Sequence, residues 1–302
     1  MNIVVMVAGG REPVLDHAVV KTVLQIGRGD TLRWLDPVAA VEFTAPTLDA
    51  PALSRIREIC RTHQTDVFAV PAHARRKSML IADMDSTIIQ QECIDELAVA
   101  AGAGNEVAAI TNRAMNGEIP FAEATRKRLS YLAGLDLAIL DQILTRRIVL
   151  TPGAGELVGT MRQNGAWCVL VSGGYTVFSE PISARLGFHE NHANRLLTAD
   201  GRLTGRVAMP FLDGQKKHRI MTRIMADRKL SVDQVLAVGD GSNDLPMLKA
   251  AGLGVAFRAK PIVARQCRHH IRHSDLRSLL YLQGYSSCSF VSGPALPETA
   301  HR

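Results

Sequence analysis

The stretch Ile81-Ala82-Asp83-Met84-Asp85-Ser86-Thr87 places two carboxylates two residues apart, directly after an apolar, strand-like run. At this spacing a chain that leaves a strand can present both acids to one cleft, the first as a nucleophile and the second as a proton donor. A carboxylate can attack phosphorus and form a covalent aspartyl phosphate. The stretch therefore favours phosphoryl transfer, although Asp-x-Asp also occurs in metal-binding loops and ordinary turns.

Two further stretches downstream have the same character. Val169-Leu170-Val171-Ser172-Gly173-Gly174 and Val238-Gly239-Asp240-Gly241-Ser242-Asn243-Asp244 each end an apolar run with small, hydroxylic or acidic residues, and Lys217 lies between them. In an open parallel sheet, ligands bind at the carboxyl ends of the strands. We therefore expect the three strand ends to converge on one site.

This ordered set of motifs resembles the haloacid dehalogenase-like phosphatases, and within them the phosphoserine phosphatases. The resemblance covers roughly residues 78 to 285 and also includes Glu92 and Arg126-Lys127-Arg128. It implies a Mg²⁺-dependent enzyme that converts O-phospho-L-serine to L-serine and phosphate through phosphorylated Asp83, the last step of serine biosynthesis. It also implies an α/β fold, with a Rossmann-like parallel sheet as the core and an inserted helical cap.

The residue types at the predicted site suit this chemistry. Asp83 is ionised at neutral pH and can attack without a general base. Asp85 would protonate the departing alkoxide and then deprotonate the water that cleaves the aspartyl phosphate. Lys217 would offset the repulsion between carboxylate and phosphate, and the spacing to Asp240 in the resembled family selects it over Lys216.

Phosphate and metal would be held by groups from the three strand ends. Glycines allow close backbone approach and successive N–H groups bind anions, so Ser172 and the Gly173 amide are expected to hold phosphate oxygens, with Asn243 placed to hydrogen-bond phosphate or substrate. Mg²⁺ prefers oxygen ligands. The resemblance assigns it to the Asp83 and Asp240 carboxylates and the Asp85 main-chain carbonyl. Asp244 would orient these ligands or Lys217, or merely favour a helix start.

The resemblance also assigns substrate specificity to the cap. Glu92 matches the residue that binds the substrate ammonium, and Arg128 matches the residue that binds its carboxylate, for which a guanidinium has the fitting planar fork. Met115, Phe121 and Gly173 match other pocket positions. Without the resemblance, Arg128 reads as one more solvated charge, and Met115 and Phe121 as plain helical packing.

The chain divides into three predicted parts. Residues 1–76 follow a βαββαβ order that predicts a ferredoxin-like α+β module, similar to the ACT-type regulatory domains; a dimerisation or solubility appendage, giving a homodimer, is weighed equally. Residues 77–285 form the predicted phosphatase domain, with its helical cap at about 92–150. Residues 286–302 are rich in Ser, Pro and Gly, and we expect disorder there.

Composition excludes several classes of protein. An apolar fraction of 47% with 21% charged residues predicts a folded globular chain, and no stretch supplies about twenty uninterrupted apolar residues for a membrane span. We expect a cytoplasmic protein that binds neither membrane nor nucleic acid, because its net charge of +6 is scattered in small clusters without interleaved aromatics. Five scattered cysteines argue against a disulfide framework and a zinc site.

Two alternatives remain open from the sequence. The enzyme could pass phosphate from Asp83 to another alcohol, or hydrolyse a different small phosphomonoester. In a second alternative, the chain is a regulatory amino-acid-binding protein, which the presence of both Asp83 and Asp85 opposes. A metal site at His269, His270 and His273 is disfavoured, because that segment reads as an edge strand or loop, where the spacing does not converge.

Overall fold

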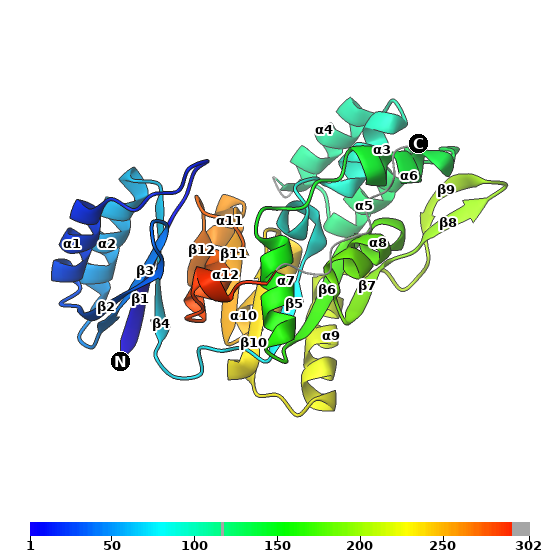
Figure 1. Cartoon of the computed structure of the whole chain (residues 1–302). Coiled ribbons are helices and arrows are strands. Elements are labelled where there is room, and N and C mark those ends of the chain that lie inside the picture. The colour runs from blue at the N-terminus through cyan, green and yellow to red at the C-terminus, as the bar shows by residue number, and fades with distance from the viewer. Residues whose placement is uncertain (116–117, 292–302) are drawn as a thin grey trace, which may run out of the picture.

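The first seventy residues consist of short apolar runs separated by polar segments. They fold as a four-stranded antiparallel sheet with two helices. The computed structural model describes residues 1–115 and 118–291 (Figure 1). The elements of this module are β1 (Asn2–Ala8), α1 (His17–Ile26), β2 (Asp30–Asp36), β3 (Ala40–Ala45), α2 (Ala50–Thr62) and β4 (Thr65–Pro71). The sheet order is β2-β3-β1-β4, so the predicted ferredoxin-like topology is confirmed.

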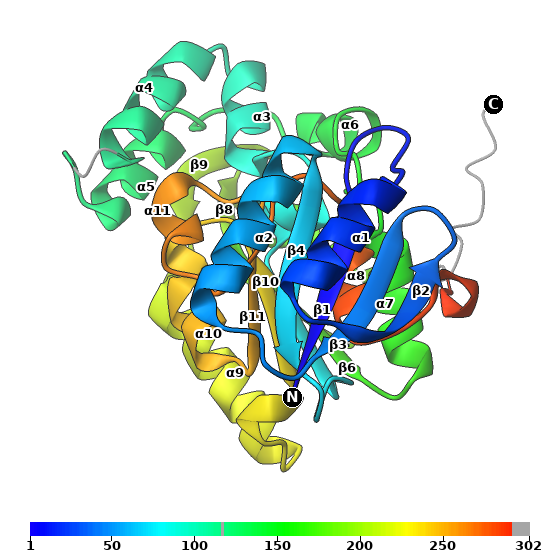
Figure 2. The ribbon, with the colours of Figure 1, turned by 90° about the vertical axis from the view of Figure 1, so that its left-hand side faces the viewer.

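The two faces of this sheet are buried in different ways. Both helices cover one face (Figure 2), where Val4 and Met6 of β1 pack with Val23 of α1 and Ile56 of α2. Each helix begins at an aspartate whose side chain accepts a bond from the first turn. The opposite face carries apolar residues from β1 and β4, and it shares one hydrophobic core with the rest of the chain.

The second unit is built on a six-stranded parallel sheet, which confirms the predicted α/β core. The sheet order is β12-β11-β10-β5-β6-β7. The strands are β5 (Met79–Ala82), β6 (Trp167–Tyr175), β7 (Glu190–Asn194), β10 (Val235–Gly239), β11 (Leu253–Phe257) and β12 (His269–Ile271). Strand β7 is not predicted from the sequence, because its polar residues Glu-Asn-His-Ala-Asn show no apolar alternation.

Helices cover both faces of this sheet because the strand side chains alternate. In β5, Leu80 and Ala82 join the core that includes α7 (Ala154–Gln163), α8 (Thr176–Leu186) and α12 (Ser278–Leu282). Met79 and Ile81 point to the other side, into a core with α9 (Gly214–Asp227) and α10 (Leu245–Ala250). A short helix, α11 (Pro261–Ala264), lies between β11 and β12.

The predicted helical insert is present between β5 and β6. Its helices are α3 (Cys93–Ala100), α4 (Gly104–Met115), α5 (Phe121–Ser130) and α6 (Ala138–Arg146). They gather at one end of the molecule (Figure 1), beside the hairpin of β8 (Leu196–Ala199) and β9 (Arg202–Val207). The hairpin is joined to the insert by backbone hydrogen bonds between Gly134 and Leu203 and between Leu203 and Leu135. No helix in the described ranges is long and apolar enough to cross a membrane.

Two acidic side chains of the N-terminal module fasten it to the sheet unit. The Asp66 carboxylate accepts bonds from the backbone N–H of Arg272, His273 and Ser274 at 2.9–3.0 Å and from the Ser274 hydroxyl at 2.6 Å. Glu42 pairs with Arg75, whose guanidinium also donates to the main-chain oxygens of Tyr281 and Leu282. The module is therefore docked by polar contacts as well as by the shared core.

The prediction of a disordered tail from Ser286 is wrong for residues 286–291. Ser287–Ser289 form one helical turn, the Phe290 ring lies 5.2 Å from that of Tyr281, and the Val291 N–H donates to the Thr160 hydroxyl at 2.8 Å. An aromatic side chain that finds an apolar partner overrides a Ser-rich composition. Residues 292–302 lie outside the described ranges.

Candidate active site

The first two acids of the predicted site lie at the carboxyl end of β5. Asp83 follows the strand directly, and its backbone N–H donates to the Val238 carbonyl of β10. The Oδ1 atom of Asp83 accepts a bond from the Met84 N–H at 2.8 Å. The chain then forms one wide turn, η1 (Met84–Ile88), in which Ser86 has φ +53°. This left-handed residue reverses the chain, so that the Asp85 side chain turns back toward the strand ends.

Lys217 is fully buried and makes two ion pairs. Its Nζ lies 2.7 Å from Asp83 Oδ1 and 2.7 Å from Asp244 Oδ1. Helix α9 begins after Asp213, whose side chain accepts from the Lys216 N–H. Lys216 itself is only half-buried and donates to the Pro210 carbonyl. A charge this deeply buried persists only when it is paired, and the two carboxylates raise the pKa of Lys217 well above its ordinary value.

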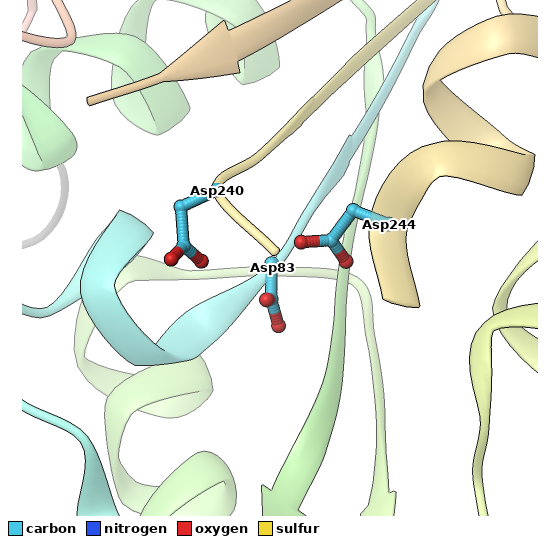
Figure 3. Close-up of side chains that lie close together, drawn as sticks. All are labelled: Asp83, Asp240 and Asp244. Atoms are coloured by element: carbon cyan, nitrogen blue, oxygen red, sulfur yellow. The ribbon is translucent and has the colours of Figure 1, made fainter. Parts of the chain in front are cut away.

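Three aspartates form a cluster that could hold a metal ion (Figure 3). One carboxylate oxygen each from Asp83, Asp240 and Asp244 lies within 4.8 Å of the others. Asp240 follows β10, and Asp244 ends the short turn η3 (Ser242–Asp244). Asp244 therefore joins the cluster, where the sequence analysis gave it only an orienting part. The Asp85 carboxylate, which was not expected to be a ligand, is not part of the cluster.

The charge balance of this cluster fits a divalent cation. Burial, followed by the neighbouring Asp244 charge, raises the pKa of Asp83 well above its ordinary value, against the opposing effect of Lys217. Burial and the charges of Asp244 and Glu92 likewise raise the pKa of Asp240. One lysine cannot neutralise three carboxylates at this separation. A hard cation with oxygen ligands would supply the missing positive charge.

Asp85 is surrounded differently from Asp83. Its Oδ1 accepts from the Cys93 N–H at 3.0 Å, and its Oδ2 accepts from the Ser172 hydroxyl at 3.1 Å. Burial and the nearby Glu92 charge raise the pKa of Asp85 to about 6. A carboxyl group with a pKa near working pH can both give and take a proton. The two acids thus differ in their partners, since Asp83 pairs with Lys217 and Asp85 accepts bonds from Cys93 and Ser172.

Ser172, Gly173 and Gly174 form a tightly packed polar segment near the end of β6. The Gly174 N–H donates to Ser172 Oγ at 2.8 Å. A Cβ at Gly174 would lie 2.4 Å from Asp85 Oδ2, so only glycine allows the strand to approach the acid this closely. At Gly173 a Cβ would meet the Asn243 amide nitrogen at 3.5 Å. Ser172, Gly173 and Asn243 are therefore brought together as the sequence analysis expected.

Asn194, a buried residue at the end of β7, is a site residue that was not predicted from the sequence. Its Nδ2 donates to the Gly173 carbonyl at 2.8 Å, and its Oδ1 accepts from the Leu212 N–H at 2.7 Å. The first bond holds the Gly173 carbonyl, and the second holds the Asn194 amide in place. No motif marks this residue, because its strand was itself not predicted.

The insert contributes Glu92 and Arg128. Glu92 comes just before α3 and accepts a 2.6 Å bond from the Ser86 hydroxyl. Arg128 lies on α5, and within the described residues its Nη atoms make only long contacts of 3.4 and 3.5 Å, to the hydroxyls of Thr111 and Thr125. Its buried Nε has no partner among the described residues. Such an under-paired guanidinium is suited to receive an anionic ligand.

Two other predicted pocket residues cannot be placed by their side chains. Met115 ends α4 and Phe121 begins α5. Their side chains lie outside what the structure describes. Their assignment to the substrate pocket therefore stays a prediction.

Comparison with known proteins points to one family. The family model described as haloacid dehalogenase-like hydrolase matches residues 80–249, which is more than half of the chain. Phosphoserine phosphatase of Streptomyces coelicolor is 39% identical over 251 residues, covering 82% of this chain and 61% of that protein. The chain thus spans less than two thirds of that relative's length.

Two solved structures are similar to different extents of the chain. A haloacid dehalogenase family hydrolase from Salmonella enterica serovar Typhi has a TM-score of 0.83 at 28% identity, covering 93% of this chain and 98% of that one. A phospho-aspartyl intermediate analogue of phosphoserine phosphatase has a TM-score of 0.64 at 37% identity, covering 68% of this chain and 98% of that one. The first likeness thus extends over most of the chain, including its N-terminal module.

Proposed function

Because this chain belongs to the haloacid dehalogenase-like hydrolases, we propose that it hydrolyses O-phospho-L-serine to L-serine and inorganic phosphate through phosphorylated Asp83. The observation that carries the proposal is the pair of differently held acids. Asp83 forms an ion pair with the buried Lys217, whereas Asp85 accepts a hydrogen bond from the Ser172 hydroxyl and has a pKa of about 6. The similarity to phosphoserine phosphatases supports the choice of substrate.

In the first step Asp83 attacks the phosphorus atom. Its Oδ1 is occupied by Lys217 and by the Met84 N–H, which leaves Oδ2 to form the new bond. The bond between phosphorus and the serine oxygen breaks, and Asp85 gives its proton to that oxygen. Lys217, together with Ser172 and the Gly173 N–H, stabilises the charge that develops on the phosphoryl oxygens.

In the second step water replaces the aspartate. Asp85, now ionised, takes a proton from water while the water oxygen attacks phosphorus. The bond to Asp83 breaks, and inorganic phosphate is released with both acids restored. The clustered carboxylates suit Mg²⁺, which Asp83 and Asp240 would hold together with the Asp85 main-chain carbonyl. Mg²⁺ would neutralise phosphate charge that otherwise repels the nucleophile.

Selectivity for phosphoserine would come from the insert. The Glu92 carboxylate, held by Ser86, would bind the substrate ammonium. Arg128 would bind the substrate carboxylate with the donors that now lack good partners. Met115 and Phe121 would border the pocket at the adjoining ends of α4 and α5.

The test is Mg²⁺-dependent phosphate release from O-phospho-L-serine and from p-nitrophenyl phosphate, which lacks both the ammonium and the carboxylate. Arg128→Ala should raise KM for phosphoserine by roughly 10- to 100-fold, since a charge-assisted bond contributes about 1.5–3 kcal/mol. It should leave turnover of p-nitrophenyl phosphate nearly unchanged. Arg126→Ala, an exposed arginine on the same helix, is the matched control. Equal losses on both substrates would refute the assignment of Arg128.

A further inference from the structure

A second concave site lies at the seam between the N-terminal module and the sheet unit. It has a volume of about 330 Å³ and is lined by the end of β4, the connecting segment, the end of α10 and the residues before β12. Asp233, Leu253 and His269, all in its wall, lie at the amino ends of β10, β11 and β12. The catalytic residues lie at the carboxyl ends. The cavity is therefore separate from the active site, at the opposite ends of the strands.

Three cations in the wall of this cavity keep unused hydrogen-bond donors. Lys77 Nζ donates to two main-chain carbonyls, at 2.7 and 2.6 Å, and Lys249 Nζ donates to the Gln266 side chain at 2.7 Å. An ammonium has three N–H donors, so one remains on Lys77 and two on Lys249. The Arg268 side chain makes no hydrogen bond within the described ranges, and none of the three cations forms an ion pair there.

Acidic groups do not balance these cations. Asp233 is the one acidic residue among the described residues of the wall. Next to the wall, Arg57 donates to the Arg268 carbonyl at 3.4 Å, which brings a further guanidinium to this side of the seam. Burial, and after it the charges of Arg268 and Arg272, lower the pKa of Arg57. The seam therefore holds a concentrated positive potential.

A buried polar atom in the same wall also lacks a partner. His269 is buried at the start of β12, and its Nδ1 makes no hydrogen bond among the described residues. Burial and the charges of Arg268 and Arg57 lower the pKa of His269 to about 4, so the ring is neutral at physiological pH. The positive charge of the cavity thus comes from its lysines and arginines. Buried polar atoms without partners are rare in native structures, and they commonly mark an unseen ligand, ion or water.

We propose that this seam cavity binds a small organic anion with at least two negative charges, such as a phosphorylated or polycarboxylate metabolite. The free donors of Lys77, Lys249 and Arg268 are spread around one wall, and together they can bind separate anionic groups of one molecule. A zwitterionic amino acid would satisfy them poorly, because its ammonium would meet the same positive potential. The proposal does not depend on the substrate of the catalytic site.

The test is isothermal titration calorimetry of the metal-free full chain, with pyrophosphate as the phosphate probe and citrate as the carboxylate probe. Without metal, the aspartate cluster of the catalytic site repels both probes. Lys249→Gln combined with Arg268→Gln should weaken binding at least about tenfold, because charge-assisted bonds are removed. Both side chains are exposed, so the fold should tolerate the change. Whichever probe binds more tightly identifies the anionic group that the cavity prefers.

The control is Lys21→Gln combined with Arg206→Gln, which removes two exposed positive charges far from the seam. It should bind each probe as the wild type does. The proposal is overturned if the wild type binds neither probe, or if both double variants weaken binding equally, since that would indicate diffuse surface charge. Weakening of probe binding by Arg128→Ala to the same extent as by the seam double variant would also overturn it, by placing the anion in the catalytic site.

Discussion

Buried carboxylates occur in two regions of this protein, and the two regions differ in how fully those carboxylates are paired. In the N-terminal module, Asp66 accepts four hydrogen bonds from residues 272–274, and Glu42 pairs with two arginines. At the carboxyl ends of the parallel strands, Asp83, Asp240 and Asp244 crowd around a single lysine. The first group is saturated by the protein itself, and the second is not.

The difference separates structural acids from reactive ones. A saturated buried carboxylate contributes to stability, because removing it leaves its donors unpaired. An under-compensated cluster destabilises the chain that carries it, and it persists where charge is needed for binding or chemistry. Substituting one acid from each group and measuring both stability and turnover tests whether the two groups differ in this way.

The largest effect is expected for Asp83→Asn. Loss of the nucleophile should lower kcat by more than about 10⁴-fold, since no other step can substitute for the covalent one. The folded structure should be retained, because Asn is isosteric and repulsion within the cluster falls. Phosphate release and thermal unfolding measure the two effects. Asp227→Asn, an exposed acid on α9, is the matched control and should change neither. Substantial residual turnover would contradict the proposed nucleophile.

Asp66→Ala should give the opposite result. Three backbone N–H groups and a hydroxyl lose their acceptor, and we expect a loss of about 3–5 kcal/mol in the free energy of unfolding. The rate per folded molecule should stay unchanged. Asp49→Ala, which removes the helix cap of α2, is the control and should cost only about 1 kcal/mol. Urea denaturation measures both variants, and a similar loss in the two would show that Asp66 is not a special anchor.

The smallest effect concerns the pH dependence of stability. The folded-state pKa of Asp85 is raised from 3.8 to about 6, so between these values the folded protein binds this proton more tightly than the unfolded chain. Stability of the metal-free protein should therefore fall as pH rises through that window. Asp85→Asn should make this slope shallower by about one proton. Urea titrations at several pH values measure the slope, and an unchanged slope would contradict the raised pKa.

The sequence could predict the site better than the surroundings that hold it. Asp83, Asp85 and Asp240 follow apolar strands, and Ser172 lies near the end of another, so strand order alone brings them together. Asn194 could not be predicted, because a polar edge strand has no periodic signal and its contact with Gly173 joins separate parts of the chain. Asp244 lies in the aspartate cluster because of the tight turn η3. The motif does not specify the geometry of this turn.

The fold of the N-terminal module could be predicted, but its attachment could not. Apolar runs of the right length indicated βαββαβ. Nothing in Asp66 distinguishes it from a solvated acid, since its four donors lie more than two hundred residues later. Long-range polar contacts of this kind leave no local pattern. The ordered segment at residues 286–291 was missed for the same reason, because its partners Tyr281 and Thr160 are set by tertiary packing.

The core that the module shares with α12 has a consequence for how the chain is made. Its first four strands leave the ribosome early, but the apolar face of β1 and β4 is covered by Leu279, Leu280 and Tyr281. At synthesis rates of about 5–20 residues per second, roughly 10–40 s pass between the end of β4 and the arrival of that cover. During this interval the nascent module exposes an apolar surface that is prone to aggregation. Chaperone demand and translation speed over residues 72–285 should therefore influence the yield of native protein.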